Sequence, residues 1–98
     1  MTLHDAPARG GLLTRGRFEA EFENIDAARA AARDSRAVGF IVDVPRETAQ
    51  GWRVVGRHKL PFPIDERDRY VSRVHAIATR HGGRFSRFVE EPLTEADD

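Results

Sequence analysis

Cysteine is absent from the 98-residue sequence. Disulfide bonds, thiolate zinc sites and a thiol nucleophile are therefore excluded, and a small domain without disulfides is typical of the reducing cytosol. No apolar run approaches the roughly 18 residues of a membrane-spanning helix. The N-terminal region also lacks the long apolar segment of a signal peptide, because Leu12 and Leu13 are its only adjacent apolar pair. We therefore expect a soluble, cytoplasmic protein.

An excess of positive charge is also missing. The 16 arginine and lysine residues are balanced by 16 aspartate and glutamate residues, which gives a formal net charge of zero. A general nucleic-acid-binding protein normally carries a positive excess, because its cations replace the counterions of the phosphate backbone. The composition therefore argues against direct nucleic-acid binding.

The length suits a single domain. Residues 1–14 contain a proline and a glycine pair without apolar periodicity, and residues 92–98 are acidic with Leu93 as the one apolar anchor. Both ends are predicted to be flexible tails. Residues 15–91 are then predicted to form one α+β domain.

Two segments alternate between polar and apolar side chains, which is typical of strands with one buried and one solvated face. They are Thr14–Glu23 and Trp52–Leu60. Two shorter segments, Val38–Val44 and Arg84–Glu90, are also predicted to be strands. Pro45–Gly51 is interpreted as a connecting loop.

Two helices are predicted between these strands. Ile25–Arg36 is rich in helix formers, and Asn24 precedes it as a candidate N-cap. A second apolar pattern with helical spacing begins at Glu66, with Asp65 as its expected N-cap. Gly82 follows this pattern at the place where a left-handed residue often ends a helix.

The resulting order, β-α-β-β-α-β, fits a ferredoxin-like fold with both helices on one face of a four-stranded antiparallel sheet. The strands Thr14–Glu23 and Trp52–Leu60 are expected in the middle of the sheet, and Pro61 and Pro63 are expected to end it. The predicted core comprises Phe18, Ala20, Phe22, Phe40, Val42, Trp52, Val54, Leu60, Val71, Val74, Ile77 and Ala78.

The opposite face of the sheet is expected to be open and charged. Candidate partner-binding residues there are Arg17, Glu19, Glu21, Arg53 and Arg57. Opposite charges on neighbouring strands contribute roughly 0.2–1 kcal/mol per pair. A local basic cluster, Arg53, Arg57, His58 and Lys59, is expected either to contact RNA or to pair with Glu19 and Glu21 of the neighbouring strand. RNA binding by base stacking is disfavoured, because this face of the central strands carries no aromatic residue.

The sequence shows no catalytic or metal-binding constellation. His75 and His81 are six residues apart, whereas a helical metal pair is spaced by four. His58 falls on the core side of its strand and is expected to be a partly buried structural histidine. No serine lies in a nucleophile elbow, and neither glycine pair has the setting of a phosphate loop. We expect no cofactor, no metal and no enzymatic activity.

A family resemblance rests on three stretches. Gly39–Val42 follows the first helix, Trp52–Leu60 is extended, and the second helix begins with Ile64–Glu66 and ends in His81–Phe85. In this pattern the chain resembles the RraB-type regulators of ribonuclease activity, the bacterial ribonuclease E inhibitors, over roughly residues 16–91. Members typically continue after the aromatic residue with Asp-Gly-Trp, where this chain has Ser86–Phe88.

The resemblance implies a ferredoxin-like fold and a protein that inhibits a ribonuclease of the E type by direct contact, without catalysis. We expect the protein to be a monomer or a homodimer. Two alternatives remain open. One is a ferredoxin-like module that binds a small ligand or dimerises through exposed apolar residues, with Ile41, Val55 and Phe88 as candidates. The other is a small dimeric enzyme with a pocket lined by His58 or His75.

Overall fold

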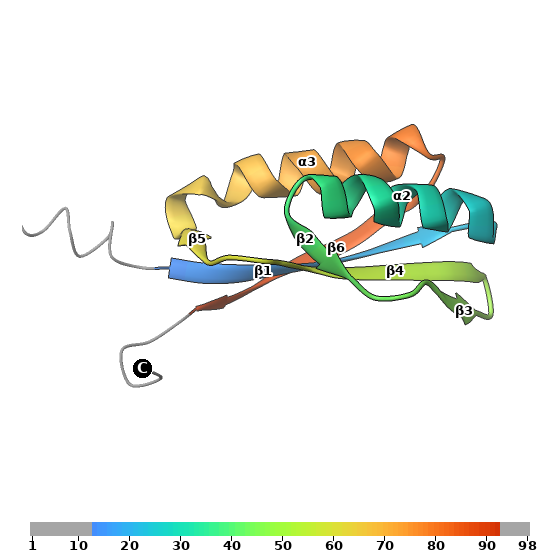
Figure 1. Ribbon diagram of the computed structural model, residues 1–98, viewed down its shortest axis with the longest axis horizontal. Helices are drawn as coiled ribbons and strands as arrows, with labels where there is room; N and C mark the ends of the chain where they lie inside the picture. The colour runs from blue at the N-terminus through green and yellow to red at the C-terminus, as the bar shows by residue number, and fades with distance from the viewer. Residues whose placement is uncertain (1–12, 93–98) are drawn as a thin grey trace, which may run out of the picture.

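The computed structural model describes residues 13–92, so the predicted tails lie almost entirely outside the described residues. Two helices cover one face of an antiparallel sheet (Figure 1). The elements are β1 (Leu13–Phe22), α2 (Ile25–Ala37), β2 (Phe40–Val42), β3 (Arg46–Thr48), β4 (Gly51–His58), β5 (Phe62–Pro63), a 3-10 turn (Ile64–Glu66), α3 (Arg67–Arg80) and β6 (Arg84–Pro92). The predicted α+β class is confirmed.

The strands β1 and β4 form the middle of the sheet. They pair with each other from Arg17↔Arg57 to Phe22↔Trp52, β2 and β3 pair with the far side of β4, and β5 and β6 pair with β1. Leu13, which the sequence placed in a tail, belongs to β1, as does Thr14, where the predicted strand began. The predicted alternation of β1 is confirmed, because its even-numbered residues are buried and its odd-numbered residues are not.

The sheet has six strands, so the predicted number of four is wrong. The segment interpreted as a loop contains β3, which folds back on β4 through a turn in which the Thr48 hydroxyl accepts from the Gln50 amide. Gly51 closes this turn with a φ of 145°. The strand β5 lies where prolines were expected to stop the sheet. Phe62–Pro63 tolerates proline because it pairs with the sheet on one side only.

One of the two predicted helix starts is confirmed. Asn24 caps α2, where its side-chain oxygen accepts from the Ala27 amide at 2.9 Å. Asp65 is not the N-cap of α3, because it lies inside the 3-10 turn; Glu66 occupies the cap position without a side-chain cap bond. A 3-10 turn at a helix start satisfies some of the free amides by itself.

The predicted end of α3 is confirmed. Gly82 has a φ of 75°, its amide donates to the Thr79 carbonyl, and the Gly83 amide donates to the Ala78 carbonyl. This is a complete Schellman motif, which requires a left-handed residue at the first position after the cap. The tight ending directs the chain straight back into β6.

Most of the predicted core is confirmed. The buried members of that set are Phe18, Ala20, Phe22, Phe40, Val42, Val54, Val74, Ile77 and Ala78. Trp52 and Val71 are only partly buried, and Leu60 is 64% exposed. Leu60 is exposed because β4 ends at His58, so the alternation does not continue to it. Phe62 occupies the core beyond β4 instead, at 2% exposure.

The strand β6 contains a bulge that the sequence did not predict. Its register on β1 shifts between Glu19 and Ala20, so Phe85 lies opposite Ala20 while Phe88 lies opposite Phe18. Both aromatic residues therefore point toward the helices, although their sequence spacing places them on opposite faces of a regular strand. Phe88 is buried and Phe85 is partly buried.

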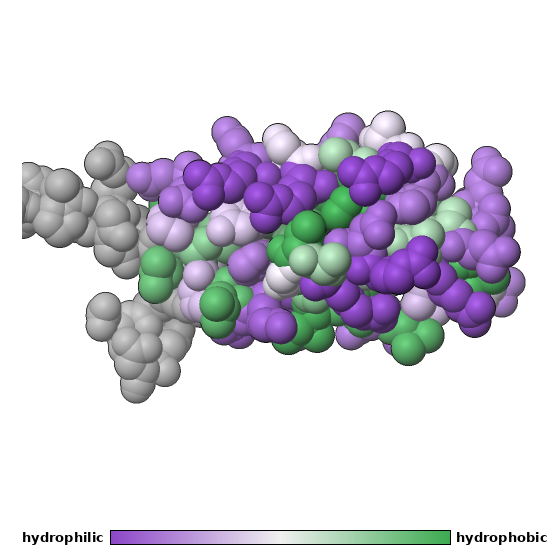
Figure 2. Space-filling view, turned by 45° about the horizontal axis from the view of Figure 1, so that its top comes forward, coloured by the Kyte–Doolittle hydropathy of each residue, from purple (hydrophilic) through white to green (hydrophobic). Residues whose placement is uncertain are grey.

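The outer surface of the helix layer is largely hydrophilic (Figure 2). On α2 it carries Arg29, Arg33 and Arg36, all of which are exposed. The inner side of α2 is formed by the small residues Ala28, Ala31, Ala32 and Ser35, which are buried against the sheet. Small side chains let the helix lie close to the strands. Because α3 lies on the same side as α2, neither helix covers the opposite face of the sheet.

Candidate functional site

The open face of the sheet is the side turned away from α2 and α3 (Figure 1). Because the even-numbered residues of β1 are buried under the helices, its odd-numbered residues point to this side. All five candidate residues from the sequence lie here, since Arg17, Glu19 and Glu21 face Arg57, Val55 and Arg53 across the two central strands. β6 contributes Arg87 opposite Glu19.

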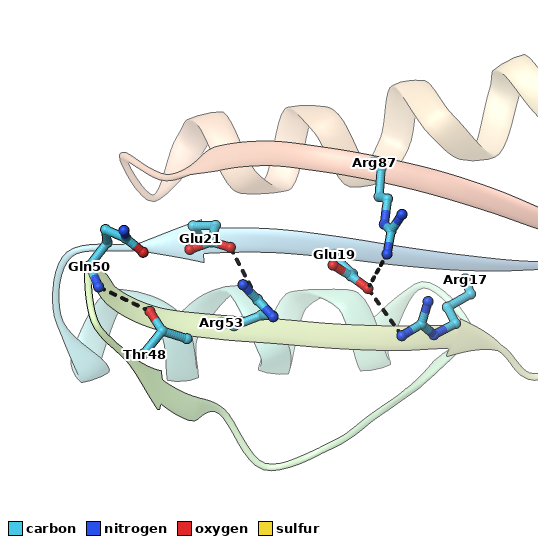
Figure 3. A network of polar contacts seen from close by, with 7 residues as sticks. All are labelled: Arg17, Glu19, Glu21, Thr48, Gln50, Arg53 and Arg87. Atoms are coloured by element: carbon cyan, nitrogen blue, oxygen red, sulfur yellow. Dashed lines mark hydrogen bonds and ion pairs between the residues drawn. The ribbon is translucent and has the colours of Figure 1, made fainter.

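Ion pairs link these side chains across three strands (Figure 3). The Glu21 carboxylate accepts from Nε of Arg53 at 3.0 Å, and the two residues are direct cross-strand partners. The Glu19 carboxylate contacts Arg17 at 3.0 Å and Arg87 at 3.5 Å. The predicted pairing of an acid with a base across the two central strands is therefore present for Glu21 and Arg53, whereas Glu19 pairs with its own strand and with β6.

The two kinds of charge lie at different depths. The side chains of Glu19 and Glu21 are only 12% and 15% exposed, whereas those of Arg53 and Arg87 are 43% and 63% exposed. The carboxylates thus form the floor of the face, and the guanidinium groups reach over them into solvent. A partner that approaches this face meets cations first, even though the whole chain has no net charge.

Arg57 has no ion-pair partner among residues 13–92. It is exposed, and its direct neighbour across the strands is Arg17. Like charges in directly opposite positions are unfavourable, and Glu19 offsets the charge of Arg17 but not that of Arg57. An anionic group from outside would relieve that repulsion.

The segment between β2 and β3 borders one side of the open face. It encloses a shallow hollow of about 250 Å³ over β1 and β4. The lining combines three arginines, two acids and two valines: Arg17, Arg46, Arg53, Glu19, Asp43, Val44 and Val55. Val44 is 81% exposed and offers an apolar contact beside the charges. The face therefore combines cationic groups with a small apolar element.

The predicted basic cluster of β4 is not brought together. Arg53 and Arg57 lie on the open face, whereas the ring of His58 lies on the helix side. Its ring centroid is 4.9 Å from that of Phe40 and 4.7 Å from that of Tyr70, and both contacts are edge-on. Nδ1 of His58 also lies 2.6 Å from the Leu60 carbonyl oxygen. His58 is the partly buried histidine that the sequence predicted, and it fixes the end of β4.

A second polar cluster joins the two helices, and the sequence did not reveal it. Nε2–H of His81, at the end of α3, donates to the Asp34 carboxylate of α2 at 2.7 Å, and Arg80 contacts the same oxygen at 3.3 Å. The hydrogen bond from His81 is the main reason that the pKa of Asp34 lies below its ordinary value of 3.8. The partners are 47 residues apart, so no local pattern indicates the contact.

The two histidines considered for an enzyme pocket, His58 and His75, lie on different elements, β4 and α3. His75 is exposed on α3 beside Phe85, and neither His75 nor His58 lines the hollow on the open face. Among residues 13–92, no group of three or more His, Asp or Glu side chains is placed to hold a metal ion.

Neither helix in this part of the chain has the length and hydropathy needed to cross a membrane.

A comparison of the sequence with protein-family models and with curated proteins finds no match. The resemblance to the ribonuclease E inhibitors therefore stays a prediction. The geometry of the open face is the observation on which a function can be based.

Proposed function

We propose that this chain is a regulatory protein that binds an acidic surface of a protein partner through the open face, and that the partner is a ribonuclease of the E type. The observation that carries the binding proposal is the layer of guanidinium groups raised above the less exposed carboxylates of Glu19 and Glu21. The nature of the partner rests on the family resemblance alone. Such a partner would place the protein in the cytoplasm.

The fold supports this proposal by holding the cations in place. Arg17, Arg53 and Arg87 are each tied to a carboxylate of β1, the central strand between β4 and β6. Side chains that are ordered before binding lose less rotamer freedom when the complex forms. The floor of acids therefore orients the arginines, and the arginines meet the partner.

We further propose that the fold is ferredoxin-like, with β3 and β5 as short additions. Support comes from the placement of β1 and β4 in the middle of the sheet, with β2 beside β4 and β6 beside β1. Both helices cover the same face. In this arrangement a partner docks on the uncovered face, and inhibition follows from masking of the partner's surface without a chemical step by this chain.

The test compares two exposed arginines on opposite sides of the molecule. Arg57→Glu reverses a charge on the open face, and Arg29→Glu makes the same change on the helix layer. Binding to purified ribonuclease E of the same organism is measured by calorimetry, and inhibition is measured as RNA cleavage. We expect Arg57→Glu to weaken binding on the order of tenfold, because it places an acid against an acidic surface.

Arg29→Glu should bind and inhibit as the wild-type chain does. The proposal is contradicted if the wild-type chain does not bind ribonuclease E at micromolar concentrations. It is also contradicted if Arg29→Glu weakens binding and Arg57→Glu does not, because the helix layer would then be the docking surface.

A further inference from the structure

The sheet has two outer edges, and they differ in how they are protected. At one edge β2 is only three residues long, and the Arg36 guanidinium donates to the Val42 carbonyl there. At the other edge β6 is nine residues long and pairs with no strand except β1 among the described residues. A long unpaired edge is a template for the addition of another strand.

The backbone groups that β6 offers follow from the ladder. The Asp43 amide donates to the Val55 carbonyl, so odd-numbered residues of β4 bond toward β2. The bonding direction alternates along a strand, so β1 bonds β4 through its even-numbered residues and β6 through its odd-numbered ones. Val89 therefore bonds to β1, whereas Phe88 and Glu90 direct their N–H and C=O groups outward.

The side chains of this edge are complementary to themselves. On the open face β6 presents Arg87, then the half-buried Val89, then Glu91, because these residues lie opposite Glu19, Arg17 and Arg15 of β1. A base and an acid thus stand at equal distances on either side of a valine. When a second copy of the strand is turned by 180° about Val89, its Arg87 falls where the first copy has Glu91, and its Glu91 where the first copy has Arg87.

We infer that the outer edge of β6 pairs with the same edge of a second copy of this chain, antiparallel and centred on Val89. In this register Arg87 of each copy lies opposite Glu91 of the other. Phe88 and Glu90 form the hydrogen-bonded pairs, and Val89 meets its symmetry mate in the closer, non-hydrogen-bonded position.

The neighbouring registers are less favourable. A centre at Phe88 places Arg87 opposite Val89, so that Arg87 keeps its contact to Glu19 but gains no acid from the second copy. A centre at Glu90 places Glu91 opposite Val89 and puts the two Glu90 carboxylates, each in an ion pair with Arg67, directly opposite each other. Both alternatives use the same outward backbone groups, so charge decides between them.

The dimer goes beyond the proposed function and does not depend on it. It joins the two open faces into one continuous face across the shared edge, so that the arginines of both copies lie on the same side. The shared edge is short, and we expect association in the micromolar range.

The test is sedimentation equilibrium of the full chain, whose monomer mass is 11.0 kDa, from about 1 µM to about 500 µM. The wild-type chain is expected to shift from monomer to dimer over this range. Arg87→Glu and Glu91→Arg are each expected to weaken association about tenfold, because each turns two attractive pairs of the symmetric dimer into repulsive ones. The double variant R87E/E91R restores opposite charges and should dimerise as the wild type does.

Arg29→Glu on the helix layer is the matched control and should leave the dimer unchanged. A wild-type chain that stays monomeric throughout overturns the inference. A dimer that survives both single variants, or a folded double variant that does not regain it, overturns the edge and register. Circular dichroism and thermal unfolding show whether each variant is folded. Glu91 is not one of the cations of the proposed function, so loss of the dimer in Glu91→Arg with retained ribonuclease binding would leave the proposed function standing.

Discussion

At the centre of the sheet, the ring of Phe18 packs directly against the backbone of Gly56. A Cβ atom added to Gly56 of β4 would lie 2.5 Å from Cε2 and 2.9 Å from Cζ of Phe18, and 3.2 Å from a methyl group of Val42. Phe18 is itself packed edge-on to Phe40 at 5.2 Å, so it has little room to move. The absence of a side chain at Gly56 is therefore part of the core packing.

Gly56→Ala is expected to lower the free energy of unfolding by about 1–3 kcal/mol, because an extra carbon in a filled core forces side chains off their rotamers. Arg57→Ala at the next, exposed position is the control and should change it by less than about 0.5 kcal/mol. Urea denaturation of both variants gives the comparison. Unchanged or increased stability of Gly56→Ala would contradict the close contact with Phe18.

At this scale the sequence predicts faces well where a strand is regular. The period-two pattern correctly placed Phe18 and Phe22 in the core and Glu19 on the open face. It failed on β6, because one extra residue in a bulge reverses the parity of everything beyond it. Ser86, in the skipped position, is neither glycine nor proline and gives no signal of a bulge.

The two helices are held to each other by charge as well as by packing. The contact from His81 and Arg80 to Asp34 joins the end of α3 to the last turns of α2. Its contribution depends on the carboxylate being ionised. Because the folded state lowers the pKa of Asp34 below 3.8, this stabilisation is present above that value and is lost as the pH falls through the lowered pKa.

Asp34→Asn should therefore be less stable than the wild type at about pH 5, and the difference should shrink as the pH falls toward about 2. Glu47→Gln, at an exposed position of β3, is the control for loss of a carboxylate and should show no such convergence. The measurement is the free energy of unfolding of both variants and of the wild type across this pH range. A difference that stays constant with pH would contradict a role for the ionised carboxylate.

The long elements could be predicted from the sequence, and the short ones could not. The helical pattern of α3 and its glycine end carry strong local signals, and both were correct. β3 and β5 have three and two residues, too few to show a period. β3 forms because a hairpin turn folds it against β4, and β5 forms because it lies beside the start of β1. Both depend on contacts between segments, which a local sequence pattern does not show.

At the scale of the whole molecule, the net charge of the chain differs from the charge that the open face presents to solvent. The chain has no net charge, yet its open face presents guanidinium groups above a floor of carboxylates. The sequence placed all five candidate residues on this face but did not predict the difference in depth between acids and bases. That difference follows from side-chain length, because an arginine reaches farther from the sheet than a glutamate on the neighbouring strand.

The central claim, that the raised cations bind the partner, is tested most directly by removing one raised charge. Arg53→Gln keeps a long polar side chain opposite Glu21 on β4 but removes the guanidinium charge. We predict that its dissociation constant for ribonuclease E rises about tenfold, while its free energy of unfolding stays within about 1 kcal/mol of the wild type. Unchanged affinity in this variant would contradict the account.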